Sequence, residues 1–302
     1  VVPCILFWGF SSLINGLLTI DNEFTFSSIN TIFTPISIIV CLVFFKEELG
    51  TIVLAVGTLI GSILNFMFLL SVALKRKIIA LSLPDFKSEN IIILFKQIPA
   101  KLTAGLLVGV NPIVDQYFAA QLIAGSIAAL NFGIKIPAFA IGIIAIAISN
   151  VLLPYFSKQA VEDKMQAFIK LKQMLKNIII ISSIAVVILA LLSHPIVTLL
   201  FERNAFTSSD STIVARIQQM YLIQIPFYVS ALIMVKFLIS INKNTFMAFA
   251  SFISLVLNFI LNYILMDLMD VYGLALSTSL VALVNSIILY SYILHIKKKD
   301  FK

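Results

Sequence analysis

Four ionisable residues lie well inside long apolar runs of the sequence: Lys101, Asp115, Lys135 and Lys236. A charge at the centre of a bilayer costs about 2.5–3.5 kcal/mol on insertion scales, so such groups usually face a bundle interior or a water-filled cavity. Lysines in a low-dielectric cavity attract anions and repel the cations that a drug exporter carries. The three lysines therefore predict binding of an anionic substrate, and the carboxylate predicts a polar partner or a cation.

The alternative for each lysine is that its long stem carries the ammonium to the membrane surface. Lys135 and Lys236 are the deepest, with at least eight mostly apolar residues on both sides. A lysine stem cannot cross half a bilayer, which favours a cavity for these two, whereas Lys101 fits either interpretation. No acidic residue lies within two helical turns of Lys135, and Pro137 would bend the helix beside it. We expect an anionic ligand to supply the missing charge.

Asn258 and Asn262 lie one helical turn apart in the run VLNFILNYIL and share a helix face. Two interpretations are open. Their amides either hydrogen-bond a neighbouring helix, or their carbonyl oxygens bind a cation together with a carboxylate placed nearby by the fold, because hard cations prefer oxygen ligands.

Patterns typical of enzymes are missing from the sequence. It contains no Walker loop, HExxH or GxSxG motif, and His194 and His295 have no carboxylate or cysteine beside them. Cys4 and Cys41 lie in apolar runs without metal-ligand spacing. We expect no catalysis.

The elements that must position these residues are membrane-spanning helices. Of 302 residues, 61% are hydrophobic and 12% are charged, and the mean hydropathy is +1.09, whereas soluble domains carry about a quarter charged residues. The apolar runs are continuous rather than alternating, which favours an all-α integral membrane protein over a barrel. A span needs about 20 apolar residues. The sequence has nine such runs: 1–20, 28–45, 51–73, 91–115, 126–152, 177–201, 213–240, 245–266 and 273–294.

Basic residues of the loops predict the orientation, because cytoplasmic loops are enriched in lysine and arginine. With nine alternating spans, one side holds only Lys46, Arg203 and Arg216. The C-terminus is then cytoplasmic and residue 1 outside, with an odd number of helices expected upstream. The net charge of +7 indicates contact with the anionic leaflet rather than nucleic acid. The other side holds Lys75, Arg76, Lys77, Lys87, Lys158, Lys164, Lys170, Lys172, Lys176, Lys243, Lys297, Lys298, Lys299 and Lys302.

The longest break, with Pro84, predicts a cytoplasmic linker at 74–90 between an incomplete N-terminal lobe at 1–73 and a C-terminal lobe at 91–302. Within 158–176, apolar residues recur at helical spacing among lysines. This predicts an amphipathic helix in the cytoplasmic interface; the alternative is an extension of the neighbouring spans. Two GxxxG pairs, Gly57/Gly61 and Gly105/Gly109, predict close helix packing.

Three phrases resemble a known family. The first is VDQYFAAQLIAGSIAALNFGIKIPAFAIGIIAIAISNVLLPYFSK (114–158), the second is LLFERNAFTSSDS (199–211) and the third is MVKFLISINKN (234–244). All three are similar to the MurJ/MviN lipid-linked peptidoglycan precursor flippases, within the multidrug/oligosaccharidyl-lipid/polysaccharide exporter superfamily. The similarity extends over the whole chain and is weakest in the first 90 residues.

The resemblance implies a two-lobed, MATE-like fold of about fourteen helices, of which these nine would be the fourth to the twelfth. It implies a cationic cavity, alternating access and transport of lipid II, an undecaprenyl-pyrophosphate-linked saccharide, across the bacterial inner membrane. Lys135 stands where the family has an arginine. Lys135, Lys236 and Lys101 are therefore the expected substrate-binding residues, and a monomer is expected.

Some members bind sodium, and the resemblance carries that site onto Asp115, Asn258, Asn262, the backbone of Leu274, and Thr278. Asn262 is an aspartate in those members, which implies weaker cation binding here. Sodium is the one ion or cofactor expected. The alternatives are an O-antigen-type oligosaccharide-lipid flippase, a MATE-type drug/cation antiporter, and a membrane scaffold, for which buried lysines would have no purpose.

Overall fold

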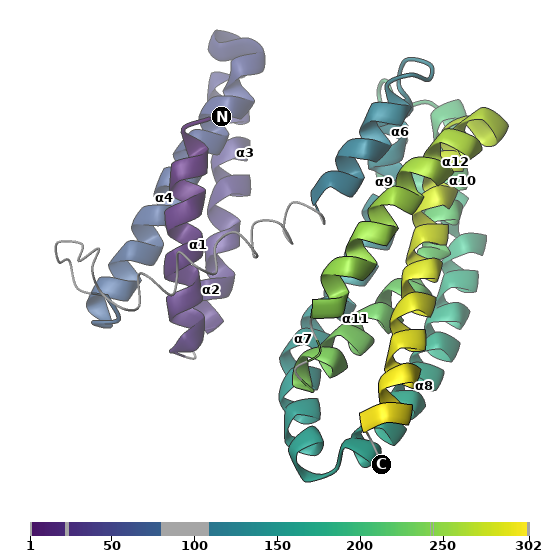
Figure 1. Cartoon of the computed structure of the whole chain (residues 1–302). Helices are drawn as coiled ribbons and strands as arrows, with labels where there is room; N and C mark the ends of the chain where they lie inside the picture. The colour runs from purple at the N-terminus through teal and green to yellow at the C-terminus, as the bar shows by residue number, and fades with distance from the viewer. Residues whose placement is uncertain (1, 22–23, 80–108, 242, 244, 301–302) are drawn as a thin grey trace. The chain divides into compact units, whose positions relative to one another are not determined.

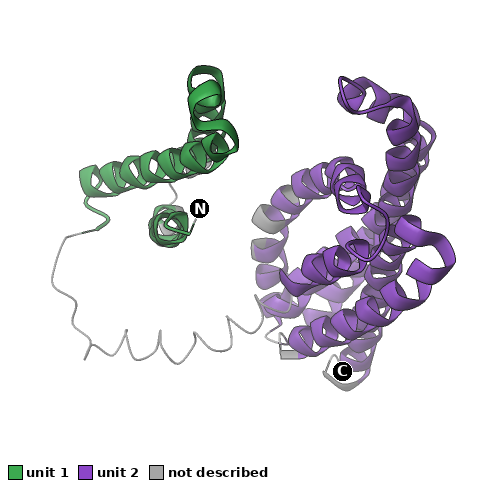
Figure 2. Cartoon of the chain, turned by 90° about the horizontal axis from the view of Figure 1, so that it is seen from above, with its two compact units in different colours: residues 1–92 green, residues 93–302 purple. Residues whose placement is uncertain are grey.

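A computed structural model describes residues 2–21, 24–79, 109–241, 243 and 245–300. These residues are almost all helical (Figure 1), and the only strand-like pairing among them is an isolated bridge between Arg203 and Phe206. The all-α expectation is confirmed. Contacts divide the chain into two compact units, residues 1–92 and 93–302 (Figure 2), and each is described by itself.

Unit 1 is built on a tight helical hairpin. Its two long helices, α3 and α4, reverse direction at Gly50, where a φ of 53° suits glycine. α1 packs beside α4, with Phe7 and Phe10 each 5.9 Å from Phe66 between ring centroids. The helices of unit 1 are α1 (Cys4–Ile20), α2 (Phe24–Ile29), the short 3₁₀ turn η1 (Asn30–Ile32), α3 (Phe33–Leu49), the 3₁₀ turn η2 (Gly50–Ile52) and α4 (Val53–Lys75).

The hairpin depends on the first GxxxG pair. A Cβ on Gly61 would stand 2.6 Å from the Cα of Thr34, and one on Gly57 would stand 2.9 Å from the Cα of Ile38. Both obstructing atoms belong to the α3 backbone, which cannot move aside as a side chain can. The close-packing interpretation is confirmed for this pair, whereas Gly105 of the second pair lies outside the described residues.

Unit 2 contains the remaining described helices. After a helical segment at 109–119, the chain forms α6 (Ser126–Gly133), α7 (Lys135–Glu162), α8 (Lys164–Leu191), α9 (Ser193–Phe201), α10 (Ser208–Leu222), α11 (Gln224–Ser240) and α12 (Thr245–Asp300). α12 comprises two arms that reverse at Asp270, whose φ is 52°. Gly273 lies against the carbonyl of Leu265, where a side chain has no room.

Prolines divide three long helical paths of unit 2. The breaks fall at Ile134, Leu192 and Ile223, each three residues before a proline: Pro137, Pro195 and Pro226. Proline has no N–H to donate to the carbonyl four residues earlier, and its ring clashes with that carbonyl. The bend expected at Pro137 is therefore present, and α6–α7, α8–α9 and α10–α11 are three kinked paths.

Five stretches of described helix are long and apolar enough to cross a membrane: Asn30–Lys75, Ser126–Ile146, Lys164–Leu191, Ser208–Ser240 and Phe246–Lys298. The first and last each contain two antiparallel arms. Eight of the nine predicted runs coincide with described helices; most of the run 91–115 lies outside the described residues.

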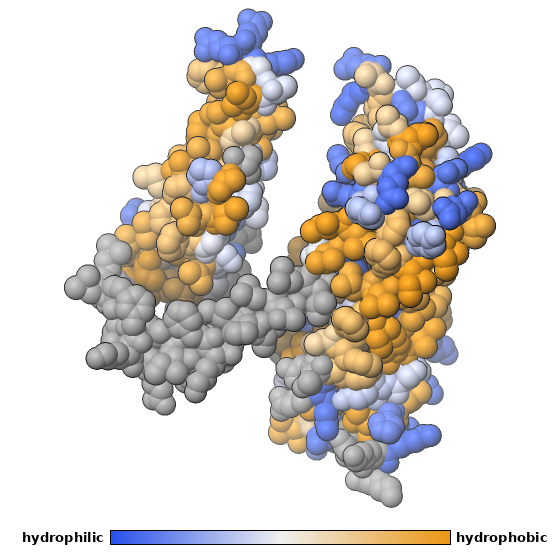
Figure 3. Space-filling model, turned by 45° about the horizontal axis from the view of Figure 1, so that its top comes forward, coloured by the Kyte–Doolittle hydropathy of each residue, from blue (hydrophilic) through white to orange (hydrophobic). Residues whose placement is uncertain are grey.

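The surface also suits hydrocarbon. Along α8, Ile180, Ile184, Ile188 and Leu191 form an exposed stripe, with 49–78% of each side chain accessible. On the face shown in Figure 3, hydrophobic residues cover the length of the units and hydrophilic residues gather toward their ends. The chain is a multi-pass membrane protein.

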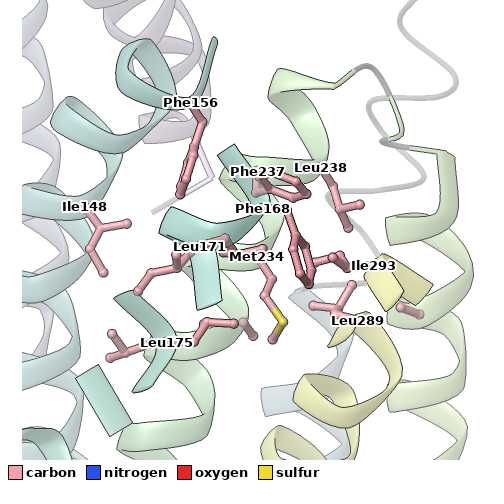
Figure 4. Packing of buried hydrophobic residues seen from close by; sticks show 14 of the residues in the cluster. Ile148, Phe156, Phe168, Leu171, Leu175, Met234, Phe237, Leu238, Leu289 and Ile293 are labelled. Atoms are coloured by element: carbon pink, nitrogen blue, oxygen red, sulfur yellow. The ribbon is translucent and has the colours of Figure 1, made fainter. Parts of the chain in front are cut away.

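The segment 158–176 belongs to two long helices rather than forming a separate helix, which agrees with the second of its two interpretations, an extension of the neighbouring spans. α7 continues to Glu162, Asp163 caps α8 by accepting from the backbone N–H groups of Met165 (2.7 Å) and Gln166 (3.2 Å), and α8 runs unbroken to Leu191. Phe168, Leu171 and Leu175 produce the helical spacing because they pack into the core of unit 2 with residues of α7, α11 and α12 (Figure 4).

Candidate functional site

Asp115 lies where three helical segments meet in unit 2. It belongs to the segment 109–119, and the other two are the arms of α12. Asn262 and Thr278 are each eight residues from the reversal at Asp270, so the antiparallel arms bring them to the same level. Phe118 and Phe259 join the first two segments through an edge-to-face contact of 5.2 Å.

The carboxylate of Asp115 accepts three side-chain hydrogen bonds. Asn262 Nδ2 (2.7 Å) and Asn258 Nδ2 (3.1 Å) donate to its Oδ1, and Thr278 Oγ1 (3.2 Å) donates to its Oδ2. Thr278 Oγ1 also lies 3.2 Å from the backbone oxygen of Leu274. The five residues proposed as cation ligands therefore converge on one point, and the asparagines hydrogen-bond a neighbouring helix as the first of their two interpretations expected.

The oxygen atoms of the residues around Asp115 suit a small monovalent cation. Asn262 Oδ1 is buried without a hydrogen-bond partner, and so is Asn111 Oδ1, one turn before Asp115 on the same helix. Together with the side-chain oxygens of Asp115, Asn258 and Thr278 and the Leu274 carbonyl, these atoms could form a set of oxygen ligands, which hard cations prefer. In this structure the amide nitrogens of Asn258 and Asn262 face Asp115. The amide oxygens would reach the ion by rotation of the side-chain amides, which exchanges oxygen and nitrogen. One carboxylate balances one positive charge.

Tyr221, on α10, also belongs to this site, although no pattern in the sequence singles it out. It is 3% exposed, it packs with Phe118 and Leu274, and its side chain interacts with that of Thr278. Asn111 was also not predicted as a residue of this site. Its spacing of four residues from Asp115 could have indicated it, because residues four apart share a helix face.

Lys135 begins α7 directly after the break at Ile134, and its side chain is exposed. Its Nζ lies 4.6 Å from the ring centroid of Phe132 and 5.7 Å from that of Phe201. Phe201 ends α9, next to the turn that leads to α10. The ammonium therefore points toward that end of unit 2, and Lys135 is only nine residues from the start of α6.

A pocket of about 450 Å³ opens beside these rings. Two of its polar side chains, Arg203 and Asn204, come from the turn between α9 and α10, where Asn204 adopts a φ of 53°, and a third, Asp210, comes from the first turn of α10. Thr207 and Asp210 fix this turn through a capping box at the start of α10. The pocket is lined by Phe132, Phe201, Arg203, Asn204, Ala205, Phe206 and Asp210.

Lys236 is not near Lys135. It lies on α11 beside Phe237, whose ring is 5.5 Å from that of Phe156 on α7. Phe156 follows Lys135 by 21 residues on α7, a rise of about 31 Å at 1.5 Å per residue. The two lysines thus occupy different levels of unit 2. Lys101 lies outside the described residues.

Comparison with solved structures identifies the fold as that of a MATE-like transporter. The MATE transporter VcmN of Vibrio cholerae matches with a TM-score of 0.66 and 14% identity, over 98% of this chain and 69% of that one. A lipid II flippase MurJ in an inward closed conformation matches with a TM-score of 0.82 and 24% identity, over 96% and 61% of the two chains.

Comparison of sequences then gives the family. The sequence model of the family "Lipid II flippase MurJ" matches residues 1–301. The probable lipid II flippase MurJ of Rickettsia prowazekii is 26% identical over 96% of this chain and 58% of its own length. That of Buchnera aphidicola from Acyrthosiphon pisum is 30% identical over 95% and 57%. The chain belongs to the MurJ lipid II flippase family, and it spans somewhat more than half the length of these relatives.

Proposed function

We propose that this protein moves lipid II, the undecaprenyl-pyrophosphate-linked peptidoglycan precursor, from the cytoplasmic to the outer leaflet of the bacterial inner membrane by alternating access. The observation that carries the proposal is the ammonium of Lys135, which is exposed within an apolar helical path and pairs with no carboxylate of the described residues. An unneutralised charge beside hydrocarbon suits a transient anionic ligand. The diphosphate of lipid II is such a ligand.

The separation of Lys135 and Lys236 along unit 2 supports two binding positions for the diphosphate rather than one. Lys236 lies toward the end of unit 2 that carries most lysines, and Lys135 lies toward the other end. In our proposal Lys236 meets the diphosphate from the cytoplasmic side, Lys135 meets it toward the outer side, and Lys101 contributes a further positive charge. The protein acts as a monomer with its C-terminus in the cytoplasm.

We further propose that sodium binds at Asp115. The ion would be held by Asp115, Asn258, Asn262, the Leu274 carbonyl and Thr278, with Asn111 as an additional oxygen. When bound it supplies the positive charge that neutralises a largely buried carboxylate. The residues themselves join the segment 109–119 to both arms of α12, which supports the proposal that ion binding would influence the arrangement of these helices.

The rival functions differ in the charges that they need. A drug/cation antiporter requires acidic groups along its path, and Asp115 is already occupied by three hydrogen-bond donors. An O-antigen-type flippase shares the diphosphate and differs in the saccharide, so only a substrate-specific test separates it from a lipid II flippase.

The test is complementation of a bacterial strain depleted of its own lipid II flippase, with the gene for this protein in its full natural length. We expect the unsubstituted protein and Lys135→Arg to restore growth, because arginine keeps the charge. Lys135→Ala should fail to restore growth at normal levels in the membrane. Lys172→Ala is the matched control, since Lys172 is an exposed lysine at the other end of the unit. Full growth with Lys135→Ala would refute the role of Lys135.

A further inference from the structure

The ammonium of Lys135 rests on aromatic rings that come from two separate helices. Phe132 lies three residues before it, across the break at Ile134, and Phe201 is the last residue of α9. Nζ is 4.6 Å from one ring centroid and 5.7 Å from the other. Both distances lie within the range of about 6 Å at which a ring face attracts a cation.

The rings are held in place by one another and by the backbone. Phe132 meets Phe201 (5.1 Å) and Phe206 (5.2 Å) edge to face. Next to Phe132, a Cβ on Gly133 would stand 2.5 Å from Ile217 Cγ2, so α6 lies tightly against α10. The side chain of Phe132 consequently starts from a fixed backbone position, whereas a lysine stem alone is flexible.

The kind of contact matters for an anion-binding lysine. A carboxylate partner would neutralise the ammonium and compete with an incoming anion. A ring face attracts the cation but accepts no conventional hydrogen bond from it, so the N–H groups of the ammonium stay available for phosphate oxygens. The nearby carboxylate of Asp210 accepts instead from Thr207 N (2.8 Å) and Oγ1 (2.8 Å), and the other charged group that lines the adjacent pocket is Arg203.

We propose that Phe132 and Phe201 are positioning residues for substrate binding, which hold the ammonium of Lys135 in place without neutralising it. This inference rests on the proposed function, because it requires Lys135 to contact the diphosphate. It goes further in assigning a role to two apolar residues of α6 and α9. Phe206 touches both rings without lying beneath the ammonium in the described contacts, so it provides a matched comparison.

The experiment measures binding of undecaprenyl pyrophosphate to the purified full-length protein in detergent by native mass spectrometry. Phe132→Leu and Phe201→Leu keep an apolar side chain but remove the ring face. Each should weaken binding about 3- to 30-fold. Phe132→Tyr, which keeps the ring, should bind like the unsubstituted protein, and Phe206→Leu should have a much smaller effect. Thermal unfolding of each variant shows whether the fold is retained.

The double variant Lys135→Ala/Phe132→Leu separates positioning from packing. If Phe132 acts through Lys135, adding Phe132→Leu to Lys135→Ala should weaken binding no further. Additive losses, an equal loss in Phe206→Leu, or normal binding by Phe132→Leu while Lys135→Ala is impaired would each overturn the inference and leave the proposed function intact. Normal binding by Lys135→Ala, or none by the unsubstituted protein, would overturn the diphosphate contact and the inference with it.

Discussion

At the scale of single residues, the site around Asp115 contains one carboxylate. The resemblance to sodium-binding members of the family implies two carboxylates in those members. Asn262 donates to Asp115 at 2.7 Å and leaves its own oxygen buried without a partner. The amide thus stabilises the carboxylate in the absence of an ion, which an aspartate at the same position would repel. We therefore expect Asn262 to exchange cation affinity for a site that is stable without an ion.

This exchange predicts that Asn262→Asp increases sodium affinity. The added carboxylate supplies a charged ligand, and tenfold tighter binding corresponds to about 1.4 kcal/mol. We expect sodium chloride to raise the unfolding temperature of the full-length variant more than that of the unsubstituted protein, because the ion binds the folded state. Asp115→Asn should lose the response. Choline chloride is the control, and an equal rise in both salts for every variant would contradict a sodium site.

The sequence predicted only part of this site. Asn258 and Asn262 could be paired from their spacing, since residues four apart share a helix face. Their contact with Asp115, 143 and 147 residues away, came from the resemblance and not from any local pattern. Tyr221 and the rings beneath Lys135 were missed, because an aromatic residue in an apolar run looks the same whether it faces lipid, core or a cation.

At the scale of elements, prolines and glycines decide where helices break and how closely they approach. The apolar runs predicted the spans because the length needed to cross hydrocarbon is fixed. They could not predict whether the apolar face of 158–176 packs on protein or on lipid, because the apolar residues repeat with a period of about 3.6 in both cases. Asp163, which caps α8, was the local signal for a break.

The α3–α4 hairpin gives a prediction at this scale. Gly61→Ala should destabilise the protein by about 1–3 kcal/mol, the usual range for overpacking, because the new methyl group would meet the backbone of Thr34. Gly142→Ala is the control, since nothing lies within 4 Å of its Cβ position and alanine favours a helix more than glycine does. Thermal unfolding in detergent compares the two. Equal stability of both variants would show that the helices can separate at no cost.

At the scale of the whole molecule, the charges of unit 2 are unevenly distributed between its ends. The α7–α8 turn and the C-terminus lie at one end, and the reversal of α12 and the turn before α10 lie at the other (Figure 1). Lysines gather around the first end: Lys158, Lys164, Lys170, Lys172, Lys176, Lys243, Lys297 and Lys298. From the positive-inside rule we expect that end to lie in the cytoplasm.

Thiol labelling tests this orientation. In a full-length protein without its native cysteines, Cys4 and Cys41 among them, we introduce Ser208→Cys at the start of α10 or Lys298→Cys near the end of α12, both exposed positions. A reagent that cannot cross the inner membrane should label only Ser208→Cys in intact cells. Disrupted membranes, in which both sites should react, are the control. Labelling of Lys298→Cys alone in intact cells would invert the orientation.

The reversal of α12 also limits how the length of the chain can change during evolution. Asn262 and Thr278 stand eight residues on either side of Asp270 and both hydrogen-bond Asp115. One inserted or deleted residue between Asp270 and either of them would turn that side chain by about 100° around its helix and shift it by about 1.5 Å. Homologues that keep the site should therefore tolerate substitutions in the stretch 263–277, except at Gly273, which has no room for a side chain. They should not tolerate insertions or deletions there, even though the reversal itself lies at the protein surface.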